Sequence, residues 1–127
     1  MSYDYVLDSF AWAEFFDGTV KGQKVRDLLE LNRIAASVIV LAELSDKCAR
    51  EGRDVEPFIR FIQAHAVIIP VTLEIAVRAG KRKKELRKSC SNISLADALH
   101  YETAKLFGAA FVTGDSDFKN IGGVLFL

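Results

Sequence analysis

Five carboxylates stand where a short apolar segment of the chain ends or where a helix is predicted to begin. Asp8 directly follows the first apolar segment, and Asp115 and Asp117 follow a later one. Glu43 lies in the early turns of one predicted helix, and Asp97 lies in the first turn of another. No Lys or Arg is adjacent in sequence to any of these acids, so local ion pairs explain them poorly.

Carboxylates that meet at one place need a cation. Two like charges about 4 Å apart cost roughly 4 kcal/mol at an effective dielectric near 20. A divalent ion removes that cost, and oxygen ligands without His or Cys select Mg²⁺ or Mn²⁺ rather than zinc. Mg²⁺ also favours phosphate oxygens as added ligands, so the pattern indicates metal-assisted hydrolysis of a phosphoester.

Each acid also has a plainer structural explanation, and the sequence leaves both open. Asp97 follows Ser94 at the spacing of a capping box. Asp8 could accept hydrogen bonds from backbone N–H groups, and the segment 114–117 could be an ordinary turn. Glu43 is hardest to explain structurally, because its neighbours are apolar on nearly every side of the helix and a lone carboxylate there needs a partner.

The apolar pattern predicts a fold in which several strands end at the same edge of a sheet. Short apolar segments alternate with segments of helical spacing. This alternation predicts a three-layer α/β/α sandwich around a central parallel sheet of four to five strands, with the chemistry at the carboxyl ends of the strands. The predicted strands are 5–7, 34–36, 67–69 (buried), 110–113 and 124–127. The predicted helices are 10–16 (capped by Ser9), 19–31, 38–50 (capped by Ser37), 54–64, a long basic-ended helix capped by Thr72, and one between Ser94 and Gly108.

Length and composition limit the class of protein. The 127 residues (14.1 kDa) predict a single domain over 1–127, and a half-apolar, one-quarter-charged composition excludes intrinsic disorder. With 17 acidic and 17 basic side chains, the balanced charge argues against coating nucleic acid by bulk electrostatics. The longest uncharged run, 61–73, is too short to cross a bilayer, and no signal peptide is evident. We therefore expect a soluble, cytoplasmic protein with no membrane contact.

Other side chains carry weaker signals. His65 and His100 lack zinc-site spacing, although His100 is three residues after Asp97 and could contact it on one helix face. The aromatic residues near the amino terminus are expected to pack in the core or at a dimer contact rather than stack on bases, and both cysteines are expected to be helical and inert. The basic run 81–88 is either a solvated helix face or a site for an RNA backbone. The aromatic residues and cysteines concerned are Phe10, Trp12, Phe15, Phe16, Cys48 and Cys90.

Four segments of the chain carry a family resemblance, in order and spacing. They are 6–12 (VLDSFAW), 37–44 (SVIVLAEL), 94–99 (SLADAL) and 109–118 (AAFVTGDSDF). Together they resemble the PIN-domain nucleases, in particular the VapC-type toxins of toxin–antitoxin pairs. The resemblance implies a three-layer sandwich that cleaves RNA with Mg²⁺ or Mn²⁺. It also implies a homodimer that a small antitoxin holds inactive.

The resemblance assigns roles residue by residue. Asp8, Glu43, Asp97 and Asp115 match the four principal acidic positions, and Asp117 matches a position that is frequently acidic. In the mechanism this implies, the aspartates hold the ion and Glu43 positions or deprotonates the attacking water. Ser9 and Thr113 match the supporting hydroxyl positions. The alternative function is a non-catalytic PIN-like module that binds RNA or a partner protein.

Overall fold

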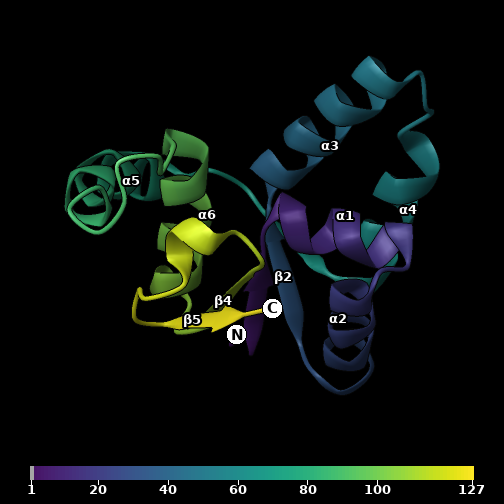
Figure 1. Cartoon of the computed structure of the whole chain (residues 1–127), viewed down its shortest axis with the longest axis horizontal. Helices are drawn as coiled ribbons and strands as arrows, with labels where there is room; N and C mark the ends of the chain where they lie inside the picture. Colours follow the sequence, from purple (N-terminus) through teal and green to yellow (C-terminus); the bar gives the residue numbers. More distant parts are fainter. Residues whose placement is uncertain (1) are drawn as a thin grey trace.

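A five-stranded parallel sheet with the strand order β3-β2-β1-β4-β5 forms the centre of the protein (Figure 1). The computed structural model describes residues 2–127. Its strands are β1 (Tyr5–Leu7), β2 (Ile34–Ser37), β3 (Val67–Ile69), β4 (Ala110–Thr113) and β5 (Val124–Phe126). The parallel sheet predicted from the apolar segments is therefore confirmed, with five strands.

Helices cover both faces of the sheet. They are α1 (Ser9–Asp17), α2 (Val20–Leu31), α3 (Val38–Glu51), α4 (Glu56–His65), α5 (Leu73–Leu86) and α6 (Leu95–Leu106), with a short 3₁₀ helix η1 (Ser116–Phe118) before β5. Figure 1 shows α5 and α6 on one side of the sheet and α1 to α4 on the other. This is the predicted three-layer sandwich.

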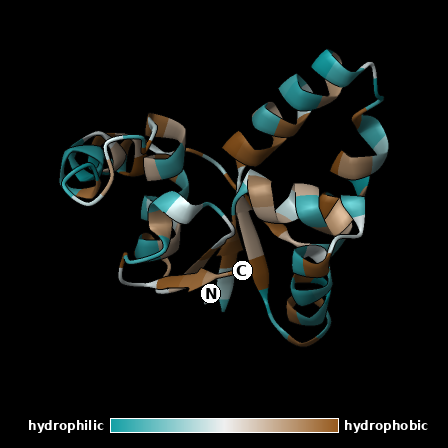
Figure 2. Cartoon of the chain, viewed as in Figure 1, coloured by the Kyte–Doolittle hydropathy of each residue, from teal (hydrophilic) through white to brown (hydrophobic). Residues whose placement is uncertain are grey.

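Strand residues alternate between two hydrophobic cores. Val6 and Phe111 pack with α5 and α6, whereas Leu7 and Val112 pack on the opposite face with α1 to α4. Such alternation follows from the two-residue period of a strand, and it requires apolar residues throughout strands covered on both faces. Figure 2 accordingly shows hydrophobic strands beneath helices whose outer faces are hydrophilic.

The order of strands creates a switch point beside β1. The chain proceeds from β1 to β2 and β3 on one side, then returns through α5 and α6 to place β4 on the other side of β1. In open α/β sheets, ligands bind at the carboxyl ends of the strands at such a point. A ligand-binding site is therefore expected at the carboxyl ends of β1 and β4.

Three local predictions were wrong. Asp8, not Ser9, caps α1, because its side chain accepts from the N–H of Ala11. Val67 is 42% exposed, because β3 lies at the edge of the sheet and is not fully covered. Cys90 lies beyond the end of α5, outside any helix, whereas Cys48 is buried in α3 as predicted.

Among the described residues, no helix has the length and apolar character needed to cross a membrane.

Candidate active site

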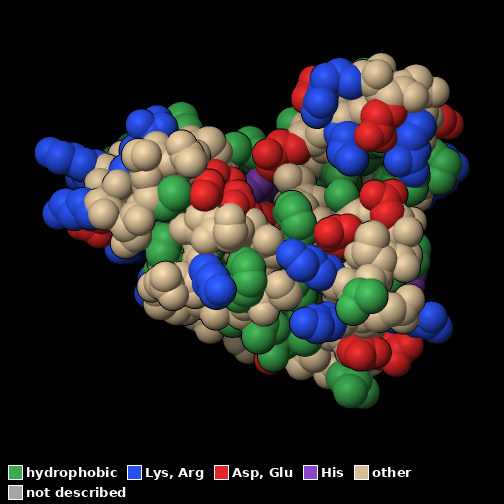
Figure 3. Space-filling model, in the orientation of Figure 1, with side chains coloured by type: hydrophobic (Ala, Val, Ile, Leu, Met, Phe, Trp, Pro, Cys, Tyr) green, Lys and Arg blue, Asp and Glu red, His purple; other side chains and the backbone are tan. Residues whose placement is uncertain are grey.

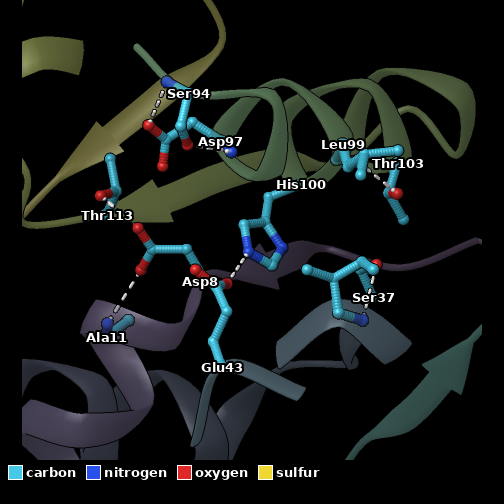
Figure 4. A network of polar contacts seen from close by, with 11 residues as sticks. Asp8, Ala11, Ser37, Glu43, Ser94, Asp97, Leu99, His100, Thr103 and Thr113 are labelled. Atoms are coloured by element: carbon cyan, nitrogen blue, oxygen red, sulfur yellow. Dashed lines mark hydrogen bonds and ion pairs between the residues drawn. The ribbon is translucent and has the colours of Figure 1, made fainter. Parts of the chain in front are cut away.

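The candidate site lies at the carboxyl ends of β1 and β4, against the amino terminus of α6 (Figure 4). Asp8 is the first residue after β1, and Thr113 is the last residue of β4. Their side chains join through a hydrogen bond although they are 105 residues apart in sequence. Asp97, in the first turn of α6, lies beside this pair (Figure 4).

Asp8 is buried and fully hydrogen-bonded. Its Oδ1 accepts from the N–H of Ala11 at 2.8 Å, and its Oδ2 accepts from the hydroxyl of Thr113 at 2.5 Å. Only 4% of the residue is exposed, and this burial raises the pKa of Asp8 from 3.8 to about 6. The two hydrogen bonds oppose that rise, while the nearby charge of Asp97 adds to it. Asp8 is therefore both a helix cap and a carboxylate whose burial is only partly offset by its two hydrogen bonds and by the charge of His100.

Asp97 also has two roles. Ser94 and Asp97 form a complete capping box, in which the Asp97 carboxylate accepts from the Ser94 N–H at 2.9 Å and the Ser94 hydroxyl accepts from the Asp97 N–H at 3.1 Å. Burial raises the pKa of Asp97, the capping bonds lower it, and the charge of Asp115 raises it again. The capping explanation is thus confirmed for Asp97, and its role at the site stays a prediction.

The loop after β4 connects the remaining aspartates to this pair. The Asp115 N–H donates to the hydroxyl of Thr113 at 3.0 Å, so that hydroxyl links Asp115 to Asp8. The Asp115 carboxylate caps η1 by accepting from the Asp117 N–H at 3.0 Å. Asp117 therefore supports the loop through its backbone, which is the turn role that the sequence allowed.

Glu43 has the partner that its apolar helix required, and that partner is His100. The Nε2 atom of His100 lies 2.5 Å from Oε1 of Glu43. Burial acts to raise the pKa of Glu43, but the hydrogen bond and charge of His100, with a contribution from the Ser9 hydroxyl, hold it below its usual value. Because an ionised carboxylate only accepts hydrogen bonds, Nε2 of His100 must be the donor.

The sequence indicated only that His100 could contact Asp97, and it did not identify His100 as the partner of Glu43. It is 1% exposed, its ring stacks on Phe111, and its Nδ1 has no hydrogen-bond partner among the described residues. The available signal was the lone carboxylate of Glu43 on α3, which needed a polar partner from another element. The pair joins α3 to α6 across 57 residues of sequence.

The donor set suits a hard divalent cation. The pKa of Asp8 and that of Asp97 are each raised by burial and by the charge of a neighbouring aspartate, and Mg²⁺ or Mn²⁺ relieves such carboxylates. As they stand, the described residues contain no group of three or more His, Cys, Asp or Glu side chains arranged to hold an ion. Asp8 uses both oxygens in hydrogen bonds and Asp97 uses one. The residues fit a cation by chemical type, and binding would require exchange of some of these hydrogen bonds.

A groove of about 300 Å³ leads away from Glu43 between α1 and α3. Its lining contains Ser9 and Phe10 from α1, and Lys47 and Arg50 from α3. Figure 3 shows acidic side chains beside a histidine where the surface is hollowed, with Lys and Arg side chains over α3 and at the end of α5. A polymer in this groove would meet Glu43 and Asp46 as well as Lys47 and Arg50, which are paired with Glu51 and Asp46.

The basic run 81–88 is partly used by the fold itself. Arg82 pairs with the buried Glu102 at 2.9 Å, and Arg87 donates to the carbonyl of Ile93. Lys81, Lys84 and Lys88 are exposed. At least two members of the run are therefore structural rather than reserved for a ligand.

Comparison with known proteins assigns a family. Residues 5–124 match the PIN domain family. No curated protein sequence matches the chain. Among solved structures, the chain is similar to a toxin–antitoxin complex from Klebsiella pneumoniae (23% identity, 96% of each chain, TM-score 0.76). It is also similar to VapBC2 from Rickettsia felis bound to a promoter DNA fragment (22% identity, 97% and 96% of the two chains, TM-score 0.72). A third similar structure is the sarcin-ricin-loop-cleaving toxin VapC20 from Mycobacterium tuberculosis (17% identity, 94% and 95%, TM-score 0.69). These structures share the fold, and the match over nearly the whole sequence shows that the chain belongs to the PIN domain family.

Proposed function

We propose that this protein is an endoribonuclease that requires Mg²⁺ or Mn²⁺ and acts in the cytoplasm as the toxin of a toxin–antitoxin pair. Membership of the PIN domain family supports nuclease-type activity. The observation that carries the proposal is the hydrogen-bonded unit at the switch point of the sheet, in which the Thr113 hydroxyl joins Asp8 to Asp115. Asp97 is close enough for its charge to raise the pKa of Asp8, and the charge of Asp115 raises the pKa of Asp97. RNA is the favoured substrate because the similar VapC20 cleaves the sarcin-ricin loop.

The roles follow from the positions of the side chains. Asp8, Asp97 and Asp115 would hold the cation, with Glu43 and Asp117 as the further acids available to it. A bound divalent ion supplies charge stabilisation for the phosphate and the leaving oxygen. Glu43 lies outside the aspartate set and is held by His100 and by the Ser9 hydroxyl, and we assign it the role of orienting or deprotonating water.

The hydroxyl groups position these acids. Thr113 holds Asp8 and the start of the Asp115 loop in one hydrogen-bonded unit. Ser9 contributes a hydrogen bond to Glu43. These contacts support the positioning roles proposed for the two hydroxyls.

A protein partner forms part of the proposal. The similar structures from Klebsiella pneumoniae and Rickettsia felis are complexes of a toxin with its antitoxin. We expect this chain to form a homodimer and to be inhibited by an antitoxin that covers the acidic site.

Cleavage by the purified full chain, freed of any bound partner, tests the activity. Labelled single-stranded RNAs and matching DNAs are incubated with Mg²⁺, Mn²⁺ or EDTA. We expect RNA cleavage with a 5′-phosphate product only with metal, and a loss of at least about 100-fold for Asp97→Asn, since metal-held charge stabilisation contributes several kcal/mol. Asn retains the capping oxygen, and Asp27→Asn, on the exposed face of α2, is the matched control. Preference for DNA, or full activity in EDTA, would refute the proposal.

Metal binding has an independent readout. Millimolar Mn²⁺ should raise the melting temperature of the wild type, and Asp97→Asn should reduce that rise. Equal shifts in the two proteins would show that the ion does not bind at Asp97.

A second function has one observation in its favour. In the part of the chain that the structure describes, the carboxylates are not arranged as a ligand set for an ion. The same arrangement is expected of a non-catalytic PIN-like binding module. For such a module, metal-loaded wild type would bind RNA or a partner protein without cleaving any RNA, and Asp97→Asn would bind equally well.

A further inference from the structure

Phe10 is the most exposed aromatic residue in the part of the chain that the structure describes. It is 37% exposed, more than any other Phe, Trp or Tyr of residues 2–127. The sequence predicted a core or dimer position for it together with Trp12, Phe15 and Phe16. That prediction is correct for Trp12, which is fully buried, and Phe15 and Phe16 pack partly buried beside it. Phe10 belongs to neither core.

The ring of Phe10 is held in place although the residue stays 37% exposed. A Cβ atom on Gly114 would lie 2.3 Å from Cε1 of the ring, so the absence of a side chain at Gly114 makes room for it. The ammonium group of Lys21 lies 5.3 Å from the ring centroid and within 3.5 Å of the Gly114 carbonyl oxygen. The loop after β4 and a lysine of α2 thus hold the ring in one orientation. An exposed side chain without such contacts would move between rotamers.

The fixed ring lies beside the proposed chemistry. Phe10 is two residues after Asp8, and it lines the same groove as Ser9 and Glu43. Lys21 forms no ion pair with any carboxylate of the described residues, so its charge is available to a ligand. An aromatic face and a cation next to a phosphoester-cleaving site match the two parts of a nucleotide, its base and its phosphate.

We propose that Phe10 is a stacking platform for an RNA nucleobase adjacent to the bond that is cut, with Lys21 close to the backbone phosphate. This inference rests on the proposed ribonuclease function and adds a substrate-binding site to it. Stacking on a Phe ring is tolerant of base identity, so the platform would set affinity and position rather than sequence preference. Lys21 next to the ring favours a polyanion over an apolar segment of a protein partner.

Binding is measured first, so that the result does not depend on cleavage. Dissociation constants for a short fluorescent single-stranded RNA are determined in EDTA with the full chain and with Phe10→Ala, Phe10→Leu and Phe10→Trp. We expect Ala and Leu to weaken binding by about 10- to 100-fold, the range that loss of one stacked base produces, and Trp to bind as well as the wild type. The Leu variant keeps apolar contact without a π-face. Melting temperatures of all variants show whether the fold is intact.

A substrate change identifies the stacked base. RNAs with a single abasic position on either side of the cleavage site are compared on wild type and Phe10→Ala. If the ring stacks on that base, the abasic substitution weakens binding to the wild type but has little further effect on Phe10→Ala. Gly114→Ala is a second test of the ring's position. Its methyl group would push the ring aside, so this variant should show part of the loss of RNA affinity expected for Phe10→Ala.

The outcomes separate this inference from the proposed function. Unchanged RNA affinity in a folded Phe10→Ala overturns the inference, whether or not the wild type cleaves. Weakened affinity with no cleavage by the wild type supports the platform and refutes the nuclease. Loss of a copurified protein from Phe10→Ala with RNA affinity unchanged would assign the ring to a protein interface instead. Failure of the wild type to bind RNA in EDTA would overturn the stacking platform alone, because cleavage with Mg²⁺ or Mn²⁺ tests the nuclease separately.

Discussion

Replacement of Asp8 by Asn should stabilise the protein at neutral pH. The side chain is 4% exposed, and burial is the largest cause of the rise in its pKa from 3.8 to about 6. A carboxyl whose pKa is raised on folding contributes stability that is fully present below the unfolded pKa and is lost as the pH rises through the folded pKa. The interval from 3.8 to about 6 corresponds to a loss of about 3 kcal/mol above pH 6.

Asn avoids that loss but reverses one hydrogen bond. Its carbonyl oxygen can still accept from the N–H of Ala11. Its amide would have to donate to the Thr113 hydroxyl oxygen, which already accepts from the N–H of Asp115, at a cost of about 1 kcal/mol. At pH 7 the Asp8→Asn protein should therefore be more stable than the wild type by about 2 kcal/mol. Below pH 4, where both side chains are neutral, it should be less stable by about 1 kcal/mol.

Urea unfolding at closely spaced pH values between 3.5 and 7.5, in EDTA, measures both limits. EDTA is needed because a bound cation would stabilise the ionised wild type and hide the effect. Asp27→Asn removes an exposed carboxylate of α2 and should follow the pH profile of the wild type. Stability curves that run parallel, without crossing between pH 4 and 6, would show that Asp8 is not the uncompensated buried acid inferred here.

Two further predictions concern packing. Arg82→Met should destabilise the protein by about 2 kcal/mol, because it leaves the carboxylate of Glu102, 2% exposed, without its ion pair. In the same urea assay Arg78→Met, which breaks an exposed pair, should cost less than about 0.5 kcal/mol, and equal losses would contradict the argument. Gly22→Ala should destabilise by about 2 kcal/mol, since its Cβ would lie 2.1 Å from the carbonyl oxygen of Glu14 and force α1 and α2 apart. A melting temperature equal to that of the wild type would show that the two helices separate without cost.

The acids of the site were predictable because local signals placed them. Asp8 and Asp115 follow apolar segments long enough to be strands, and parallel strands end at one edge of a sheet. The capping-box spacing of Ser94 and Asp97 marked the start of α6 without any knowledge of the fold. Glu43 was identified by its apolar surroundings. Their assignment as cation ligands and as water activator stays a prediction.

Contacts between distant elements were not predictable in the same way. The partner of Glu43 could have come from any element packed against α3, and only the packing of α6 across the end of the sheet selects His100. The exposure of Phe10 depends on Gly114 and Lys21, which reach it from the loop after β4 and from α2. The exposed edge position of β3 depends on the order of the strands.

The sequence by itself determined the elements, their caps and the residue types at the strand ends, because hydrophobic period and capping spacing are local properties of the chain. Only the tertiary structure decided that Asp8 is buried enough to hold a proton near pH 6, that Glu43 is paired with a histidine, and that one aromatic ring stays at the surface. Burial and partnership depend on which elements pack together, and the folded arrangement of the whole chain sets that packing.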